Sequence, residues 1–195
     1  NLIIFNGQLV EMNAKSIGTK FEGGDINIDA LDIDELVAFE GGIFVGLNGR
    51  DGALANIANA KATYEGSDIV ITSGDGMLKV ETATADDELR LDIAGEADTD
   101  SLIVGTLRAG GDLTLRSTPS TAGNIVQIAG MDVQAKTTGA LTRLEAGGNI
   151  TLTAATNDFA DLTVETGADV HVVDASALNL LDVITTGDFT LETQR

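Results

Sequence analysis

The sequence predicts an all-β fold, a parallel β-helix (β-solenoid) with coils of about 20 residues. Three observations predict this fold. A short phrase recurs along the chain, apolar and polar residues alternate around it, and the composition combines abundant Gly with almost no Pro. Together they indicate stacked strands joined by tight corners, and they disfavour a helical bundle.

The recurring phrase is Gly or Ser, then Asp or Asn, an apolar residue, any residue and a second apolar residue. Its copies lie at positions 24–28, 67–71, 111–115, 148–152 and 187–191. Weaker copies at positions 42–45, 88–91 and 169–172 divide the intervals between them. The underlying step is therefore close to the ~20 residues of a solenoid coil.

Composition supports the same fold. Hydrophobic residues make up 43% of the 195 residues, but there are only six Phe, one Tyr and no Trp, so the core must be aliphatic. The 23 Gly residues suit corners, where a positive φ is expected. Pro119 is the single Pro, as expected where most strands need their N–H groups for a neighbour on each side.

Charge and cysteine content exclude several classes of function. The net charge of −20 disfavours binding to nucleic acid or to anionic membranes. The absence of Cys excludes disulfides and thiolate metal sites. No apolar run reaches the roughly 20 residues that would cross a bilayer. Because the sequence opens without Met and stops within a strand-like phrase, we expect it to be a section of a longer protein.

Along the chain, residues 52–61 are the exception to strand periodicity, since their Ala content favours a short helical turn or irregular coil. Loops are expected at residues 83–88, 95–100 and 117–123. The apolar parity changes within residues 26–33 and 178–183, which we interpret as a corner between two short strands. The chain divides into less regular coils with acidic loops, 1–107, and more regular coils, 108–195.

In the regular part, inward-facing apolar positions can be assigned from the alternation. They are Ile150, Leu152, Leu162, Val164, Val170, Val172, Leu178, Leu180, Val183, Phe189 and Leu191. Outward positions carry Thr114, Thr151, Thr163 and Thr190. A β-branched polar residue suits an exposed strand position.

The order of phrases from residue 148 to residue 191 resembles the repeat of filamentous haemagglutinin-type adhesins and related giant β-strand-repeat exoproteins of bacteria. The resemblance covers roughly residues 108–195 and is patchy before them. It implies a right-handed parallel β-helix, secretion, and surface adhesion or fibre formation. The family brings no catalytic residues that could be transferred to this chain.

Candidate metal ligands come from clusters of carboxylates, because calcium prefers several hard oxygen ligands. The candidates are Asp32, Asp34, Glu35, Asp86, Asp87, Asp98 and Asp100. No EF-hand loop or Gly-rich calcium repeat accompanies them, so a solvated acidic surface is the simpler interpretation. Calcium is the one candidate cofactor.

Catalysis is not expected. His171 is the only histidine, and its place between Val170 and Val172 should point it into solvent. Five arginines, Arg50, Arg90, Arg108, Arg116 and Arg143, are scattered along the sequence, and aromatic platforms for sugars are sparse. A hydrolytic pair of carboxylates therefore finds little support.

We expect a structural section of a secreted bacterial adhesin or extracellular fibre. A calcium-dependent surface-layer or matrix protein and a polysaccharide-active β-helix enzyme are the alternatives. The expected partners are further coils of the same parent chain or neighbouring subunits in a fibre, with surface glycans or proteins as additional ligands. The expected location is outside the cell or on its surface.

Overall fold

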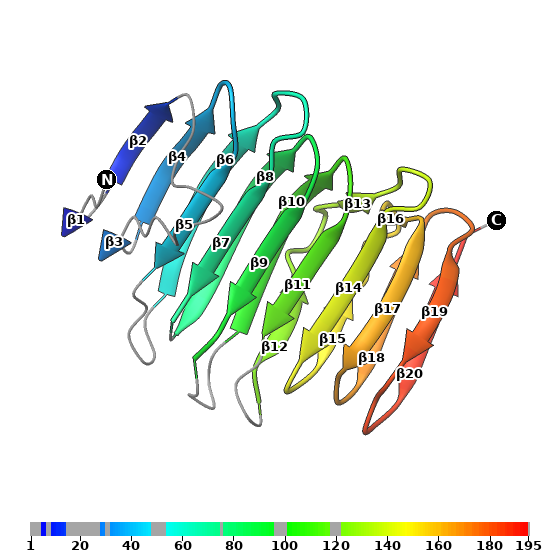
Figure 1. Cartoon of the computed structure of the whole chain (residues 1–195). Helices are drawn as coiled ribbons and strands as arrows, with labels where there is room; N and C mark the ends of the chain where they lie inside the picture. The colour runs from blue at the N-terminus through cyan, green and yellow to red at the C-terminus, as the bar shows by residue number, and fades with distance from the viewer. Residues whose placement is uncertain are drawn as a thin grey trace.

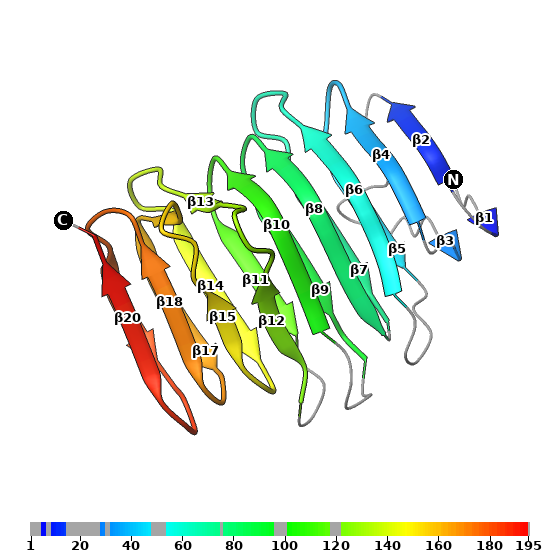
Figure 2. The same ribbon diagram turned by 180° about the vertical axis from the view of Figure 1, so that it is seen from behind.

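The computed structural model describes residues 5–6, 9–14, 28–29, 32–47, 54–74, 76–95, 101–117 and 122–194, with side chains from residue 32 onward. Over these residues the chain is an all-β parallel β-solenoid, as the sequence predicts. Two parallel sheets lie back to back, one seen in front in Figure 1 and the other from behind in Figure 2. None of the described residues forms a helix that could cross a membrane.

Sheet 1 is the larger sheet. Its strands follow one another in the order β2, β4, β6, β8, β10, β12, β15, β18 and β20, with β13 and β16 beside this path. Their bounds are β2 Leu9–Ala14, β4 Asp32–Ala38, β6 Leu54–Ala62, β8 Met77–Ala85, β10 Ser101–Ala109, β12 Asn124–Gln127, β13 Val133–Ala135, β15 Ile150–Leu152, β16 Asp158–Phe159, β18 Val170–Asp174 and β20 Phe189–Thr193.

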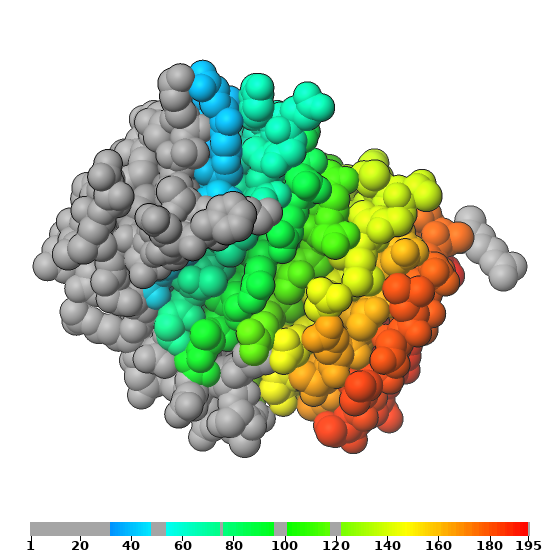
Figure 3. Space-filling view, viewed as in Figure 1, coloured from blue at the N-terminus to red at the C-terminus, as the bar shows by residue number. Residues whose placement is uncertain are grey.

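Sheet 2 covers the other side of the core. Its strands are β5 Ile43–Leu47, β7 Ile69–Ser73, β9 Leu89–Ile93, β11 Leu113–Ser117, β14 Leu141–Ala146, β17 Asp161–Thr166 and β19 Asn179–Val183. A separate pair of short strands, β1 Phe5–Asn6 and β3 Ile28–Asp29, is also parallel. The chain passes from sheet 1 to sheet 2 and back in each turn, so the turns appear as successive coloured bands in Figure 3.

Over much of the solenoid the turns are longer than the sequence predicts. Ile57 of β6 pairs with Ile33 of the turn before and with Val80 of the turn after, and Val80 pairs in turn with Val104. The side-chain contact of Glu35 with Asn59, which spans one such turn, joins residues 24 positions apart. The step shortens towards the end of the chain, where Asp169 contacts Asp188 with a separation of only 19. The sequence estimate fits these last turns, because the clearest phrases lie there. Right-handedness remains a prediction.

The core is a stack of aliphatic side chains between the two sheets. Equivalent residues of neighbouring turns, such as Ile71, Leu91 and Leu115, are fully buried one above another. Strict alternation in β7 and β11 places every second residue inside. The outward positions Thr114, Thr151, Thr163 and Thr190 are half-buried or exposed, as expected.

Residues 54–62 form strand β6 and not the expected helical turn. Ala60 stacks on Leu36 and Ala83, and Ala62 stacks on Ala38 and Ala85. Ala60 and Ala62 are fully buried, and this packing between neighbouring turns outweighs the intrinsic helix preference of Ala.

A change of apolar parity lies within one strand and not at a corner between two. In β6 both Ile57 and Ala60 point inwards, and the matching strand β8 has the same pattern with Val80 and Ala83. The slip within residues 178–183 is likewise a register shift in the pairing of β17 with β19. The slip within residues 26–33 falls mostly outside the described residues.

Candidate functional site

The recurring phrase marks the first residue of strands at both corners of the solenoid. At the corner before sheet 1, the side-chain oxygen of each Asx residue accepts a hydrogen bond from the backbone N–H of its equivalent one turn later. Asn124 accepts from Asn149 at 2.8 Å, Asn149 from Asp169 at 3.1 Å, and Asp169 from Asp188 at 3.0 Å. We call these four residues the Asx ladder.

A small residue precedes each Asx of the ladder: Ala168 before Asp169, and glycine before the other three. Two of the glycines, Gly148 and Gly187, are needed for space. A Cβ on Gly148 would lie 2.5 Å from Oδ1 of Asn124, and a Cβ on Gly187 would collide with Oδ1 of Asp169. Neither glycine has a positive φ. The expectation that these glycines serve the corners through positive φ is therefore wrong. The side chain of one turn fills the place where the next turn would carry its Cβ.

The corner before sheet 2 uses carboxylates in the same way. Asp68 accepts from the N–H of Glu88 at 3.2 Å, and Asp112 accepts from the N–H of Leu141 at 2.9 Å. The phrases at residues 67–71 and 111–115 begin strands of sheet 2, whereas those at 148–152 and 187–191 begin strands of sheet 1. The spacing between successive copies of the phrase therefore combines distances between two different corners of the solenoid.

A hollow of about 450 Å³ lies along this second corner. The turn between β10 and β11 is short and contains Gly110 and Gly111, while the turn after β13 is longer and carries Thr137 and Thr138 on the rim. Other lining residues are Asp68, Asp87, Glu88, Asp112, Gly139 and Ala140. The hollow is acidic and faces solvent along the turns.

The predicted calcium ligands are spread over different parts of the solenoid. Asp32 and Asp34 are exposed on β4, and Glu35 accepts from the amide of Asn59. Asp86 and Asp87 lie in the turn between β8 and β9, where Asp86 accepts from the N–H of Gly66 at 2.8 Å. Asp98 and Asp100 lie outside the described residues.

Within the part of the chain that the structure describes, no three His, Asp or Glu side chains come together in an arrangement that could hold a metal ion. Calcium binding by these residues thus remains a prediction.

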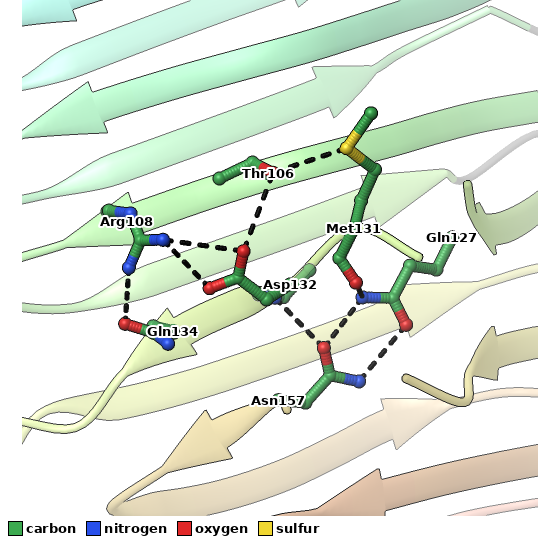
Figure 4. Close-up of polar contacts among 8 residues, drawn as sticks. Thr106, Arg108, Gln127, Met131, Asp132, Gln134 and Asn157 are labelled. Atoms are coloured by element: carbon green, nitrogen blue, oxygen red, sulfur yellow. Dashed lines mark hydrogen bonds and ion pairs between the residues drawn. The ribbon is translucent and has the colours of Figure 1, made fainter. Parts of the chain in front are cut away.

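A buried polar network holds sheet 1 together where its strands are interrupted (Figure 4). Strand β10 pairs first with β12 and then with β13, because residues 128–132 loop out between these two strands. Asn157, which is fully buried, bridges this interruption. Its Oδ1 accepts from the N–H of Val133 at 2.9 Å and from the amide of Gln127 at 2.6 Å.

The other atoms of the network are also satisfied. The Nδ2 of Asn157 donates to Oε1 of Gln127 at 3.0 Å and to the carbonyl of Leu152 at 3.2 Å. Gln127 also donates to the carbonyl of Met131 at 3.1 Å, and it accepts from the N–H of Ala154 at 3.0 Å. Two side chains thus replace the strand ladder across two successive turns.

The outer side of the same region carries an exposed ionic group. Arg108 of β10 contacts Asp132 at 3.0 Å and Gln134 at 2.6 Å, one turn further on (Figure 4). Thr106 donates towards the sulfur of Met131 at 3.3 Å. These contacts hold the loop of residues 128–132 against the sheet.

Three of the arginines that are scattered in sequence lie on the neighbouring strands β9, β11 and β14 of sheet 2. Arg90 pairs with Asp92, and Arg116 pairs with Glu145 of the next turn at 2.9 Å. Arg143 pairs with Glu165, again one turn later. The sequence interpretation of scattered arginines was wrong for these residues, since the register of the strands brings them together. Arg50 lies outside the described residues.

His171 points outwards from β18, as predicted. It is half-buried, and its Nε2 lies 2.9 Å from Oε1 of Glu192 on β20. It is therefore partnered by the next turn, which the sequence analysis did not anticipate. No nucleophile appears among its hydrogen-bond partners in the described residues.

Asp174 is a buried carboxylate that sequence analysis missed. Its two oxygens accept from the N–H groups of Phe159 at 2.8 Å and Ser176 at 2.9 Å. Burial raises the pKa of this carboxyl above its ordinary value, although the two backbone hydrogen bonds oppose the change. In the sequence, the only indication that Asp174 is buried was its position at the end of a strand, followed by a small residue.

Comparison with protein families supports a repeat architecture. Residues 88–165, which run from β9 into β17, match a family described as repeats of unknown function (DUF5649). The chain is thus a β-solenoid repeat protein in which residues 88–165 are similar to repeats of that family. Comparisons with curated proteins and with solved structures gave no match. The finer resemblance to haemagglutinin-type adhesins is not part of that family description.

The last described turn, β19 and β20, leaves apolar side chains exposed. Leu180, Leu181 and Ile184 are 41%, 53% and 56% exposed, whereas Leu162, the register partner of Leu180, is fully buried. Leu178, Val183, Phe189 and Leu191 are only partly buried against the core. The predicted inward set is thus confirmed for Ile150, Leu152, Leu162, Val164, Val170 and Val172. Leu180 aligns with the buried Leu162 but is itself exposed on the last described turn.

Proposed function

We propose that this chain is a non-catalytic structural section of a secreted bacterial adhesin or extracellular fibre. One observation carries the proposal. The polar and charged side chains with resolved partners serve mainly to join one turn of the solenoid to the next. Sites that act on a substrate usually gather such groups around a pocket and leave some of them free.

Three separate sets of contacts have this character. The Asx ladder links four successive turns at one corner. The ion pairs of Arg116 with Glu145 and of Arg143 with Glu165 link turns on sheet 2. The pair of Gln127 and Asn157 links turns within sheet 1. Repetition of nearest-neighbour contacts is what stabilises a rod along its axis.

Location outside the cell is supported by composition and by resemblance. The absence of Cys and the net charge of −20 suit a soluble repeat surface. The segment that resembles haemagglutinin-type repeats, 108–195, overlaps the segment that matches the repeat family, 88–165.

Immunogold electron microscopy of the source cells tests the proposal. Antibodies raised against the purified chain should label filaments or the outer surface, and antibodies pre-absorbed with the chain provide the control. Label confined to the cell interior would contradict the proposed location.

Catalysis is tested separately with a panel of neutral and acidic polysaccharides, each incubated with the purified chain. We expect no new reducing ends, and release of oligosaccharides that a heat-denatured sample does not produce would contradict the non-catalytic assignment.

A further inference from the structure

We propose that the outer face of the β19–β20 turn is a docking surface for one further parallel β-solenoid coil, which begins its sheet 1 strand with a small residue, Gly or Ala, followed by Asx. This inference rests on the proposed structural function and specifies the chemistry of the partner. Four properties of the face support it: its backbone, its apolar side chains, its Asx position and its charge.

The backbone of this face continues an interface that is already present throughout the chain. Strands β19 and β20 are the edge strands of sheet 2 and sheet 1, whereas the strands before them pair on both sides. An edge strand presents a row of N–H and C=O groups to any strand that can pair with it. Both edges lie side by side at the same end of the molecule (Figures 1 and 2).

The apolar side chains match those that are buried between successive turns. Leu162 and Val164 of β17 are fully buried under the turn that contains β19. The corresponding residues of the β19 turn, Leu180 and Val183, have no such cover, and neighbouring Leu181 and Ile184 are more than half exposed. A contiguous exposed apolar patch on an otherwise acidic surface marks an interaction site.

Asp188 determines which coil fits. It is the last member of the Asx ladder, and it donates its N–H to Asp169. Asn124, Asn149 and Asp169 each use a side-chain oxygen to bind the following turn, and no described residue donates to that oxygen of Asp188. The residue that comes to lie over the Asp188 carboxylate should be glycine or alanine. Gly148 and Gly187 lie over Asn124 and Asp169, where a Cβ would come too close, and Ala168 takes the equivalent place over Asn149.

Charge disfavours a second copy of this face and favours a partner with basic side chains. The sequence contains no Lys or Arg between Arg143 and Arg195, while Asp182, Asp188 and Glu192 lie on the last described turn. Elsewhere on sheet 1 an Arg pairs with an acid of the neighbouring turn, as Arg108 of β10 pairs with Asp132. The docked coil should therefore carry Arg or Lys at the position over Glu192.

An extended chain tests the inference. A duplicate of residues 175–193 is appended after Thr193. This segment has the same length as the preceding step, from Val170 to its register partner Phe189. In the duplicate, the copy of Glu192 is replaced by Arg. The matched control differs only by Gly→Val in the copy of Gly187. Hydrogen exchange of the β19 and β20 amides is compared in the extended, control and original chains, with β17 and β18 amides as the reference for intact folding.

We expect the Gly-Asx extension to slow exchange of the β20 amides at least about tenfold relative to the original chain, and the Val control to lose most of this protection. Equal protection by both extensions would overturn the requirement for a small residue before Asx. Protection by neither extension would overturn the docking surface. Concentration-dependent protection of β20 in the original chain would identify a second copy as the occupant and also overturn the inference. None of these outcomes alters the labelling experiment that tests the proposed function.

Discussion

The Asn157→Ala substitution tests whether a side-chain network replaces the strand ladder in sheet 1. Asn157 is fully buried and makes four hydrogen bonds, two with Gln127 and one each with the backbone of Val133 and Leu152. Alanine removes all four. Gln127 can keep its contacts with Met131 and Ala154, so the main loss falls on the two backbone groups.

The magnitude follows from those two groups. A buried donor or acceptor left without a partner costs about 1–3 kcal/mol, so Val133 N–H and Leu152 C=O together account for roughly 2–5 kcal/mol of lost stability. The matched control is Asn149→Ala. Asn149 is exposed and accepts one hydrogen bond, from Asp169, so we expect a loss of about 1 kcal/mol.

Urea unfolding monitored by circular dichroism measures both variants, and hydrogen exchange at the Val133 amide localises the effect. We expect Asn157→Ala to lower the free energy of unfolding by at least twice as much as Asn149→Ala and to accelerate exchange at Val133. A loss no greater than that of the control, with Val133 still protected, would refute the view that Asn157 carries the interrupted ladder.

Four further outcomes are expected. Gly148→Val should destabilise the chain by about 2 kcal/mol or more, because its Cβ would meet Asn124 Oδ1 at 2.5 Å and Ala122 O at 2.8 Å; an unchanged urea midpoint would disprove the close-approach explanation. Leu152→Asp should cost at least about 3 kcal/mol, since it places an unpaired charge in the core, and a parent-like melting curve would show that the inside and outside of β15 have been misassigned. The carboxyl of Asp174 has a raised pKa in the folded chain. Between about pH 3.8 and that raised pKa, the folded state therefore binds more protons than the unfolded state. The contribution of Asp174 to the free energy of unfolding consequently declines as the pH rises through this window. The stability of the parent relative to Asp174→Asn should therefore fall from acid to neutral pH in urea titrations, and a rise would contradict the assigned desolvation. His171→Ala should change the free energy of unfolding by less than about 1 kcal/mol, because its contact with Glu192 is exposed; a larger thermal shift would indicate a structural role for this pair.

The fold was predictable because its signals are local. Alternation in residues such as Leu113 and Leu115 places side chains on one face of a strand, and the recurring Gly-Asx phrase marks the strand starts. The β6 strand was missed because alanine in isolation favours a helix. Only its stacking on Ala38 and Ala85 shows why small residues are needed there.

The polar contacts were not predictable in the same way. Gln127 and Asn157 are 30 residues apart in sequence, a longer separation than most turns require. Arg116 and Glu145 are separated by the same long turn. The additional residues loop out at 128–132, and nothing in the sequence states how much chain each turn will contain. The pairing of the sheet 2 arginines with acids of neighbouring turns and the bridge by Asn157 therefore become visible only when strand register is known.

The sequence by itself determined that this chain is a parallel solenoid with an aliphatic core, because side-chain alternation and corner residues act within a few positions of one another. The tertiary structure decided which residues meet across turns, why Gly148 and Gly187 have no room for a side chain, and which apolar side chains remain exposed on β19 and β20. Those properties depend on the distance between successive turns and on the register of each pair of strands. Both are set by packing along the whole rod, where small differences in turn length move every later residue to a new neighbour.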